Sequence, residues 1–350
     1  MGQGVDAMTT IELNTGIERP SNPKDYITKI AGTTIAKPGT PHPLWDAFLQ
    51  RVTNDDEDLI GFLQRFLGYC MTGATWEHVL MFLYGTGANG KSTFIKTITG
   101  IFGDYAIVAP MELFLASRHE RHPTEIAKLR GARLVVAQET EKGRRWDEAK
   151  IKQLTSDDRL TGRFMRQDFF DFTPTHKLII TGNNKPSLRS IDEAIRRRFL
   201  LVPFTVKIPV DERDTKLADK LKAEWPAILR WMVEGCTQWQ RDGLMVPDVV
   251  RRATASYFED QNTIGQWVED WAVNDAGTFT TTAELFKNWT VWCVETNSYI
   301  GTEKEFVQEL EEACRDWRGF GRERKKPYGR GFKGIGLLGN RGGNRGGDAE

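Results

Sequence analysis

The sequence has few cysteines and histidines, and neither sign of charge is in excess. Its four cysteines are scattered without a C-x-x-C pair, so we expect buried thiols in a reducing compartment rather than a disulfide or zinc framework. His119 and His122 have no second metal-binding pair nearby, which favours a solvated loop over a zinc site. Lys plus Arg and Asp plus Glu both number 48, so overall charge neither indicates nor excludes binding to nucleic acid.

A long hydrophobic run is lacking as well. The N-terminus has no apolar stretch of the signal-peptide kind, and the most apolar segment, residues 62–84, is interrupted by Gln64, Arg65, Glu77 and His78. We therefore expect neither secretion nor a membrane span. With 350 residues, of which 39% are hydrophobic and 27% charged, the chain is expected to form about two globular domains.

The stretch FLYGTGANGKSTF, residues 82–94, carries the phosphate-loop pattern G-x-x-x-x-G-K-[ST]. Glycines let backbone N–H groups approach phosphate oxygens, Lys91 adds a charge toward the β and γ phosphates, and the Ser92 hydroxyl can hold Mg²⁺. A strand-like run at 79–84 and helical spacing at 93–101 argue against an accidental match in a glycine-rich turn. The sequence therefore predicts a nucleotide site, for ATP with Mg²⁺, formed by Gly85, Thr86, Gly87, Ala88, Asn89, Gly90, Lys91, Ser92 and Thr93.

We predict five successive parts along the chain. Strand-like runs at 132–139, 176–184 and 199–204 alternate with helical stretches, which predicts a parallel α/β sheet with its ligand at the carboxyl ends of the strands. Before them lies an amphipathic helical pattern, and the chain begins and ends in polar, aperiodic sequence. The parts are a flexible lead-in (1–40), a helical segment (41–75), an ATPase domain (76–250), a C-terminal domain (251–338) and a disordered Gly/Arg tail (339–350).

Polar and charged side chains follow the predicted strands. Glu139 and Glu141 come at the end of one strand, where one carboxylate can organise Mg²⁺ and another can act as a base, although a pair of surface acids is the alternative. Asn183 follows the next strand, where a carboxamide can orient water or contact the γ-phosphate. The arginines 196–198 precede the last strand and suit stabilisation of phosphoryl transfer across a subunit boundary, or equally a solvated helix end.

This order of motifs resembles superfamily 3 helicases, a viral and plasmid branch of the AAA+ ATPases, and specifically the helicase portion of phage and plasmid primase-helicases. The resemblance covers roughly residues 43–204, with a looser match beyond, and rests on GTGANGKS, AKLRGARLVVAQETEKG, KIKQLTSDDRLTGRFMRQDFFDFTPTHKLIITGNNKP and DEAIRRRFLLVPF. It implies an α/β fold with an AAA+ P-loop NTPase core.

By this resemblance Lys91 and Ser92 belong to the Walker A site, and Glu139 matches the Walker B acid that binds Mg²⁺. The family often has two adjacent acids where this sequence has Gln138 followed by Glu139. The identity of the catalytic base therefore stays open, with Glu141 as a candidate.

The same resemblance makes Asn183 the sensor 1 residue. It also implies an arginine finger, a residue that reaches the active site of the neighbouring subunit. We predict Arg198 for this role, with Arg197 as its rival.

The family also has a hairpin before sensor 1 that grips single-stranded DNA in the channel of a hexameric ring. Residues 159–172, RLTGRFMRQDFFDF, fit a hairpin with strand-like alternation around residues 165–168. The alternative is an ordinary structural hairpin, and we expect Phe169, Phe170 and Phe172 in the core in either case. The predicted DNA contacts are Arg163, Arg166 and Gln167, with Phe164 against a base.

In residues 252–338, two amphipathic helical patterns precede the basic, Gly-rich stretch RGFGRERKKPYGRGFKGIGLL. A basic hairpin after two helices resembles the wing of a winged helix, and basic residues interleaved with aromatics suit nucleic acid. We predict DNA contacts at Lys325 and Lys326, while a merely structural wing stays equally open.

These features together predict an ATP-driven DNA helicase, a homo-hexameric ring acting on single-stranded and forked duplex DNA. It would serve phage, prophage or plasmid replication in the host bacterial cytoplasm, with any primase domain upstream or in a partner protein. An AAA+ ATPase that remodels protein complexes is the first alternative, and a small-molecule P-loop kinase is the second. The ATPase rate with and without single-stranded DNA discriminates among the three.

Overall fold

The structure is a computed structural model that describes residues 9–117, 122–138, 144–188, 191–296 and 298–338. It divides into two compact units, Met1–Phe258 and Glu259–Glu350. The boundary lies a few residues beyond the position predicted between residues 250 and 251. The predicted disordered tail, 339–350, lies outside the described residues.

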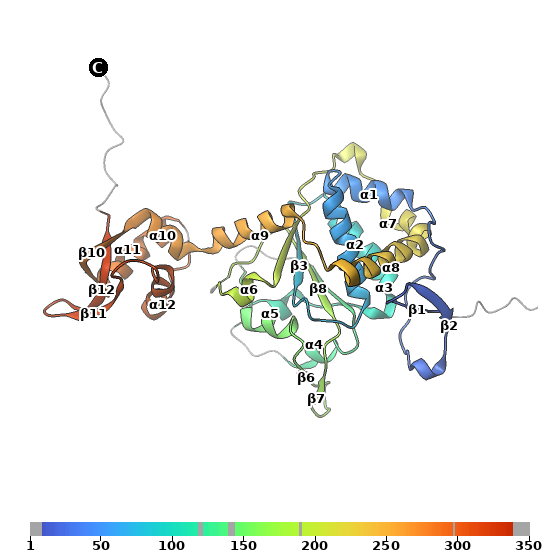
Figure 1. The fold of residues 1–350 in the computed structure, drawn as a ribbon, viewed down its shortest axis with the longest axis horizontal. Coiled ribbons are helices and arrows are strands. Elements are labelled where there is room, and N and C mark those ends of the chain that lie inside the picture. The colour runs from blue at the N-terminus through green and yellow to red at the C-terminus, as the bar shows by residue number, and fades with distance from the viewer. Residues whose placement is uncertain (1–8, 118–121, 139–143, 189–190, 297, 339–350) are drawn as a thin grey trace, which may run out of the picture. The chain divides into compact units, whose positions relative to one another are not determined.

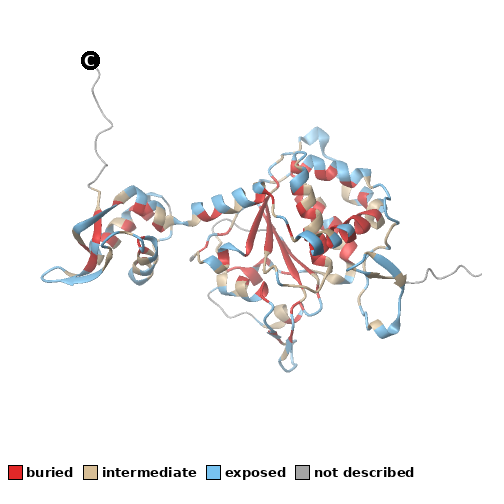
Figure 2. Cartoon of the chain, viewed as in Figure 1, coloured by how far each residue is buried: buried red, intermediate tan, exposed pale blue. Residues whose placement is uncertain are grey.

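A parallel sheet forms the centre of the first unit (Figure 1), and in the described ranges it has five strands in the order β4-β5-β8-β3-β9. Most of the strand residues are buried, as Figure 2 shows, because helices cover both faces and neither face meets water. The strands are β3 (Leu80–Tyr84), β4 (Ala106–Val108), β5 (Leu134–Gln138), β8 (Lys177–Gly182) and β9 (Phe199–Pro203). The parallel α/β sheet predicted from the sequence is thus confirmed.

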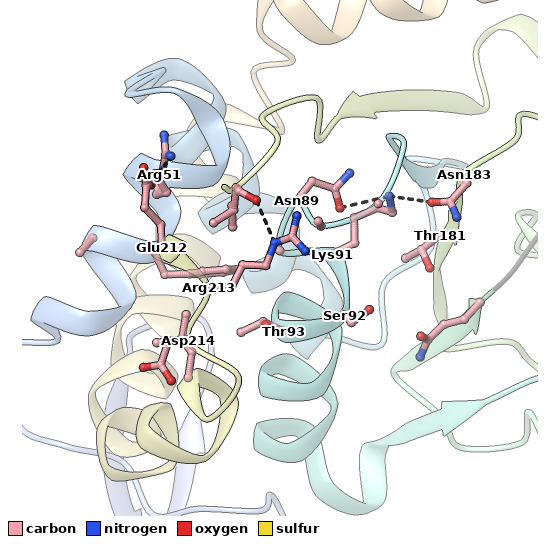
Figure 3. A pocket seen from close by; sticks show the side chains of 18 of the residues that line it. Arg51, Asn89, Lys91, Ser92, Thr93, Thr181, Asn183, Glu212, Arg213 and Asp214 are labelled. Carbon is pink, nitrogen blue, oxygen red and sulfur yellow. Dashed lines mark hydrogen bonds and ion pairs between the residues drawn. The ribbon is translucent and has the colours of Figure 1, made fainter. Parts of the chain in front are cut away.

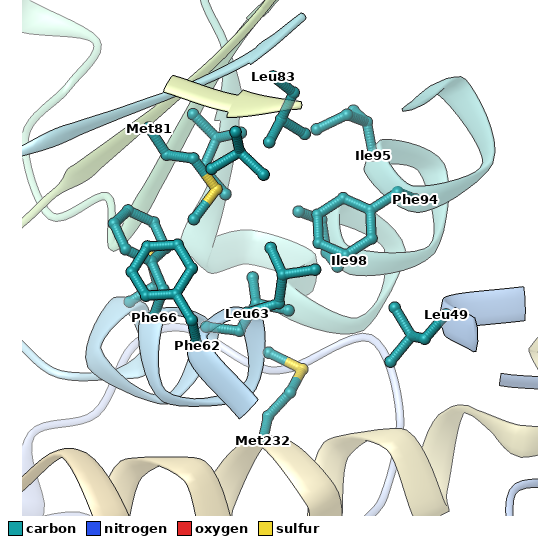
Figure 4. Close-up of a cluster of buried hydrophobic side chains, with 14 of the residues drawn as sticks. Leu49, Phe62, Leu63, Phe66, Met81, Leu83, Phe94, Ile95, Ile98 and Met232 are labelled. Atoms are coloured by element: carbon teal, nitrogen blue, oxygen red, sulfur yellow. The ribbon is translucent and has the colours of Figure 1, made fainter. Parts of the chain in front are cut away.

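Successive strand residues enter two hydrophobic cores on opposite faces of the sheet. In β3, Met81 and Leu83 join one core while Leu80 and Phe82 join the other. Helices α1 (Pro43–Thr53), α2 (Glu57–Met71), α3 (Lys91–Phe102) and α8 (Trp225–Asp242) build the first core, part of which Figure 4 shows. Helices α4 (Thr124–Ala127), α5 (Glu148–Leu154), α6 (Glu193–Arg196) and α9 (Asp248–Gln261) contribute to the second.

Residues 9–40 differ from the flexible lead-in that we expected. Strands β1 (Thr9–Glu12) and β2 (Ile17–Pro20) pair antiparallel. The buried Arg230 of α8 donates to the carbonyls of Ala36 at 2.8 Å and Gly16 at 3.0 Å, and it pairs with Glu18 at 2.6 Å. Periodicity misses this segment because polar contacts to a distant helix and a few scattered apolar residues, Ile11, Leu13 and Ile35, hold it against the first core.

The predicted hairpin is present within residues 159–172, but its strands are shorter than expected. It consists of β6 (Leu160–Gly162) and β7 (Phe170–Phe172), which pair antiparallel. Residues 165–168, which we expected to alternate as a strand, belong to the connecting turn, where Arg166 has a φ of 61°. Phe172 is buried as predicted, but the prediction for Phe169 is wrong, because it lies beyond the paired residues and is 59% exposed.

The second unit combines helices with an antiparallel sheet of three strands, in the order β10-β12-β11 within its described part. Its core contains Trp267, Trp289 and Phe306. We expected two helices and a basic hairpin, and the structure adds α10 and β10 to them. The elements are α10 (Thr263–Trp271), β10 (Ala272–Thr281), α11 (Thr282–Glu295), α12 (Glu303–Ala313), β11 (Gly321–Lys325) and β12 (Gly329–Leu337).

Two expectations from composition can be compared with the structure. All four cysteines are buried and free, as predicted. Among the residues that the structure describes, no helix has the length and apolarity that crossing a bilayer requires.

Candidate functional site

The phosphate-loop segment connects the end of β3 to the start of α3 and follows a tight path. Gly85, Gly87 and Gly90 have φ angles of 157°, 95° and 86°, in the range that favours glycine. A Cβ on Gly85 would lie 2.0 Å from the carbonyl oxygen of Phe204, so this position accepts only glycine. The loop ends at the N-terminus of the 12-residue helix α3, where backbone N–H groups and the helix dipole favour an anion.

Lys91, the first residue of α3, is 8% exposed. Its ammonium donates to the Gly85 carbonyl at 2.6 Å. It also donates to Oδ1 of Asn89 at 3.2 Å and to Oδ1 of Asn183 at 3.3 Å, as Figure 3 shows. Burial lowers the pKa of this ammonium below its ordinary value. The structure thus brings together two residues that were predicted from motifs about 90 positions apart, the Walker A lysine and the sensor 1 asparagine.

A pocket of about 550 Å³ opens beside the phosphate loop. The predicted residues from Gly87 to Thr93 line it, and Gln138, Thr181 and Asn183 line it at the carboxyl ends of β5 and β8. Gly85 and Thr86 form the start of the loop, directly after β3. This volume lies within the usual range for small-molecule sites.

The sequence analysis missed the wall of the pocket that faces the phosphate loop. Arg51 of α1 pairs with Glu212, a residue 161 positions away in the chain. Arg213 also lines the pocket, and its Nε donates to the carbonyl of Ile208 at 2.9 Å. No local motif marks these residues, because the wall forms only when two distant segments meet. Its members are Leu44, Ala47, Phe48 and Arg51 of α1 with Ile208, Glu212, Arg213, Asp214 and Leu217.

The predicted Walker B acids follow strand β5 in the sequence. Glu139 and Glu141 lie outside the described residues, directly after Gln138 at the end of β5. In the described ranges, no group of three or more His, Cys, Asp or Glu residues is arranged to hold a metal ion. Ser92 does line the pocket. The position of an Mg²⁺ ion between Ser92 and Glu139 therefore stays a prediction.

The three consecutive arginines have different environments. Arg198 is 7% exposed, and its guanidinium donates to Oγ1 of Thr155 at 3.0 Å and to the carbonyl of Ala194 at 2.6 Å. Arg196 lies over the ring of Phe258 at 5.2 Å. Arg197 is exposed. Since a residue that acts in a neighbouring subunit must extend from the surface, this geometry favours Arg197 over Arg198 as the finger.

The hairpin presents both cationic and apolar groups at its turn. Arg163 lies over the ring of Phe169 at 4.5 Å, and Arg166, Gln167 and Met165 are exposed. Phe164 is 37% exposed and stacks on Phe170 with ring centroids 5.7 Å apart. Exposed guanidinium and ring groups of this kind can contact phosphates and bases.

The hairpin of the second unit is basic at its tip. Lys325, Lys326 and Arg330 are exposed there, and Tyr328 is 65% exposed. Arg322 nearer its base is paired with Glu311, so its charge is partly neutralised. In the described part of this hairpin, exposed positive charge therefore lies at the turn and also along the strands, at Arg324 and Lys333.

The chain matches one family model and has low-identity similarity to several viral proteins. Residues 83–198 match the model of a family described as "Family of unknown function (DUF5906)". Two viral proteins named "Putative helicase" are similar to the chain: L207/L206 of Acanthamoeba polyphaga mimivirus, at 22% identity over 80% of this chain, and 022R of Frog virus 3 (isolate Goorha), at 24% identity over 67%. The chain spans only 32% and 26% of the lengths of these two relatives.

Solved structures show the same fold. An apo structure of the NrS-1 C-terminal region aligns with a TM-score of 0.55 at 13% identity, covering 94% of this chain and 82% of that one. A second structure of the region aligns with a TM-score of 0.50 at 13% identity, covering 87% of this chain and 78% of that one. At this identity the similarity demonstrates a shared fold. The sequence similarity is thus to viral proteins named as helicases, and the structural similarity is one of fold.

Proposed function

We propose that the chain is the motor of an ATP-dependent DNA helicase that assembles into a hexameric ring. The observation that carries this proposal is the contact of Lys91 with Asn183 inside a pocket at the carboxyl edge of a parallel sheet. The viral relatives named as helicases support it. We place the activity in replication of a phage, prophage or plasmid in the host bacterial cytoplasm, with a primase domain upstream or in a partner protein.

The residues of the pocket fit ATP. The N-terminus of α3 and Lys91 suit the phosphates, while the apolar side chains of Leu44, Phe48 and Leu217 on the opposite wall suit a nucleobase. The Ser92 hydroxyl and the Glu139 carboxylate would hold Mg²⁺, which neutralises charge on the phosphates when it is bound.

Each residue of the site would have a separate role in ATP hydrolysis. Lys91 holds the phosphates, Asn183 orients the attacking water, and a carboxylate at Glu139 or Glu141 accepts its proton. An arginine of the neighbouring subunit stabilises the charge that develops in the transition state, so hydrolysis depends on assembly. Arg197 is the better placed of the two predicted fingers.

Two surfaces would contact DNA. The β6–β7 hairpin offers Arg163, Arg166 and Gln167 to a single strand in the ring channel. In the second unit, helices α10 to α12 and the β10-β12-β11 sheet would form a winged helix, in which Lys325 and Lys326 at the hairpin tip would contact forked duplex DNA.

The test is the ATPase rate of the purified chain with and without single-stranded DNA, together with unwinding of a forked duplex. Stimulation by DNA and unwinding are expected, and Lys91→Ala should abolish both because the phosphates lose their buried cation. Rings that hydrolyse ATP without responding to DNA would instead indicate a remodelling ATPase. Turnover that requires a small-molecule phosphate acceptor would indicate a kinase.

A further inference from the structure

The loop after β8 must hold Asn183 beside Lys91, yet Asn183 itself is exposed toward the pocket. A side chain on a short loop keeps such a position only if the following residues are fixed. The residues that follow, 184–187, contact an element that the sequence analysis placed in another domain, the helix α9.

Tyr257 of α9 is 1% exposed, and its hydroxyl makes two hydrogen bonds. It donates to the carbonyl of Pro186 and accepts from Nε1 of Trp146 at 3.0 Å. Burial raises the pKa of Tyr257 above its ordinary range, so the hydroxyl keeps its proton and remains a donor at neutral pH. The backbone N–H of Trp146 donates in turn to the carbonyl of Ser187 at 3.0 Å. Two consecutive carbonyls of the loop are therefore held.

Lys185 adds a second connection between the loop and the nucleotide site. Its ammonium lies 4.8 Å from the ring centroid of Tyr84 and 5.6 Å from that of Tyr257, distances typical of cation–π contacts. Tyr84 directly precedes Gly85, whose carbonyl accepts from Lys91. The loop is thus linked on one side to α9 and on the other to the start of the phosphate loop.

We propose that Tyr257 is a positioning residue for ATP hydrolysis, fixing the loop 183–187 so that Asn183 stays beside Lys91. This inference rests on the proposed ATPase function. Packing alone accounts for the ring, which lies among Phe199, Phe258 and Trp146. It does not account for the hydroxyl, because a phenylalanine would fill the same space without burying a polar group.

The first experiment compares Tyr257→Phe with Tyr105→Phe. Tyr105 is a matched control, because its hydroxyl also donates to a backbone carbonyl, that of Lys29 at 3.1 Å, away from the pocket. For Tyr257→Phe we expect kcat to fall about tenfold, with the KM for ATP changed less than about twofold, since Lys91 and the phosphate loop remain intact. Tyr105→Phe should leave both constants unchanged.

Two further measurements separate positioning from general destabilisation. Amide hydrogen exchange of residues 183–188 should accelerate in Tyr257→Phe and not in Tyr105→Phe, a readout that needs no turnover. In an Asn183→Ala background, Tyr257→Phe should cause no further loss of kcat, because its effect passes through Asn183. If Tyr257→Phe does not fold, Lys185→Met, which keeps the apolar stem, is expected to give the same split between kcat and KM.

Equal kcat in the wild-type protein and Tyr257→Phe would overturn the inference, as would additive losses with Asn183→Ala. A parallel rise in KM, or faster exchange throughout the first unit, would reduce Tyr257 to a structural role. A wild-type chain with no ATPase activity would instead refute the proposed function, so the two failures are distinguishable.

Discussion

At the scale of single residues, the neighbouring arginines 197 and 198 have different environments. The buried guanidinium of Arg198 is satisfied within its own chain by Thr155 and Ala194, whereas Arg197 is exposed. An internal arginine contributes to folding, and an external one is available to another subunit. The position in a motif does not distinguish the two, because consecutive residues at the end of a short helix point in different directions.

The arginines give a prediction about stability and activity. Arg198→Ala should lower the free energy of unfolding by about 1–3 kcal/mol, since it leaves buried hydrogen-bonding partners unmet, and Arg197→Ala should leave it unchanged. Urea unfolding followed by circular dichroism measures both effects.

Arg197→Ala should instead assemble and bind ATP but barely hydrolyse it. Mixed one to one with Lys91→Ala, which is also inactive, it should regain about a quarter of the sites by random subunit exchange. A mixture that stays inactive despite proven subunit exchange would contradict Arg197 as the arginine finger. The same mixture made with Arg198→Ala in place of Arg197→Ala tests Arg198, the residue that the sequence predicts for this role.

His176 gives a prediction about pH. It is 3% exposed, and burial, with Lys177 adjacent, lowers its pKa to about 4 despite a hydrogen bond with the backbone of Leu154. The unfolded chain takes up a proton near pH 6.5 and the folded chain does not, so stability is retained above pH 6.5 and lost as pH falls toward 4.

His176→Leu should remove this loss, because leucine can occupy the buried site without taking up a proton in the unfolded chain. We expect the difference in unfolding free energy between pH 7 and pH 4 to shrink by about 3 kcal/mol in the variant, measured by urea unfolding. An unchanged pH dependence would mean that other groups cause the acid sensitivity.

At the scale of elements, the β6–β7 hairpin is the segment that we propose to contact single-stranded DNA. The hairpin turn exposes arginine and aromatic side chains rather than burying them, and none of its residues lines the pocket beside the phosphate loop. A substitution in the hairpin turn should therefore weaken DNA binding and unwinding and leave the ATP hydrolysis step unchanged.

Arg166→Ala should spare basal ATPase activity and reduce both its stimulation by single-stranded DNA and unwinding, because a phosphate contact is lost. Arg241→Ala is the control, since Arg241 is exposed and paired with Asp242 at the end of α8. Retained unwinding in Arg166→Ala would move the DNA grip to another element.

At the scale of the whole molecule, the boundary between the two units decides where the chain can be divided. Tyr257 and Phe258 belong to the core of the first unit, although the sequence suggested that this domain ends near residue 250.

Truncation after Phe258 should keep basal ATPase activity and flatten the salt dependence of DNA binding, because the basic hairpin is removed. Truncation after Val250 should also lower the melting temperature, since it empties part of the core. Equal melting temperatures for the two truncations would place the boundary where the sequence suggested.

The sequence by itself determined the phosphate loop, the parallel sheet and the order of the motifs along it. These are local properties: glycine spacing fixes a turn, an apolar run fixes a buried strand, and polar residues mark where it ends. The same reasoning located Lys91 and Asn183 without knowledge of their contact, because the carboxyl ends of parallel strands lie at one edge of the sheet.

Only the tertiary structure decided which side chains meet across long separations. Arg51 and Glu212 are 161 residues apart, Trp146 and Tyr257 are 111 apart, and neither pair has a pattern that periodicity can detect. Burial of Arg198 and exposure of Arg197 and Phe169 were likewise settled by packing, because a residue type states what a side chain can do and not what surrounds it.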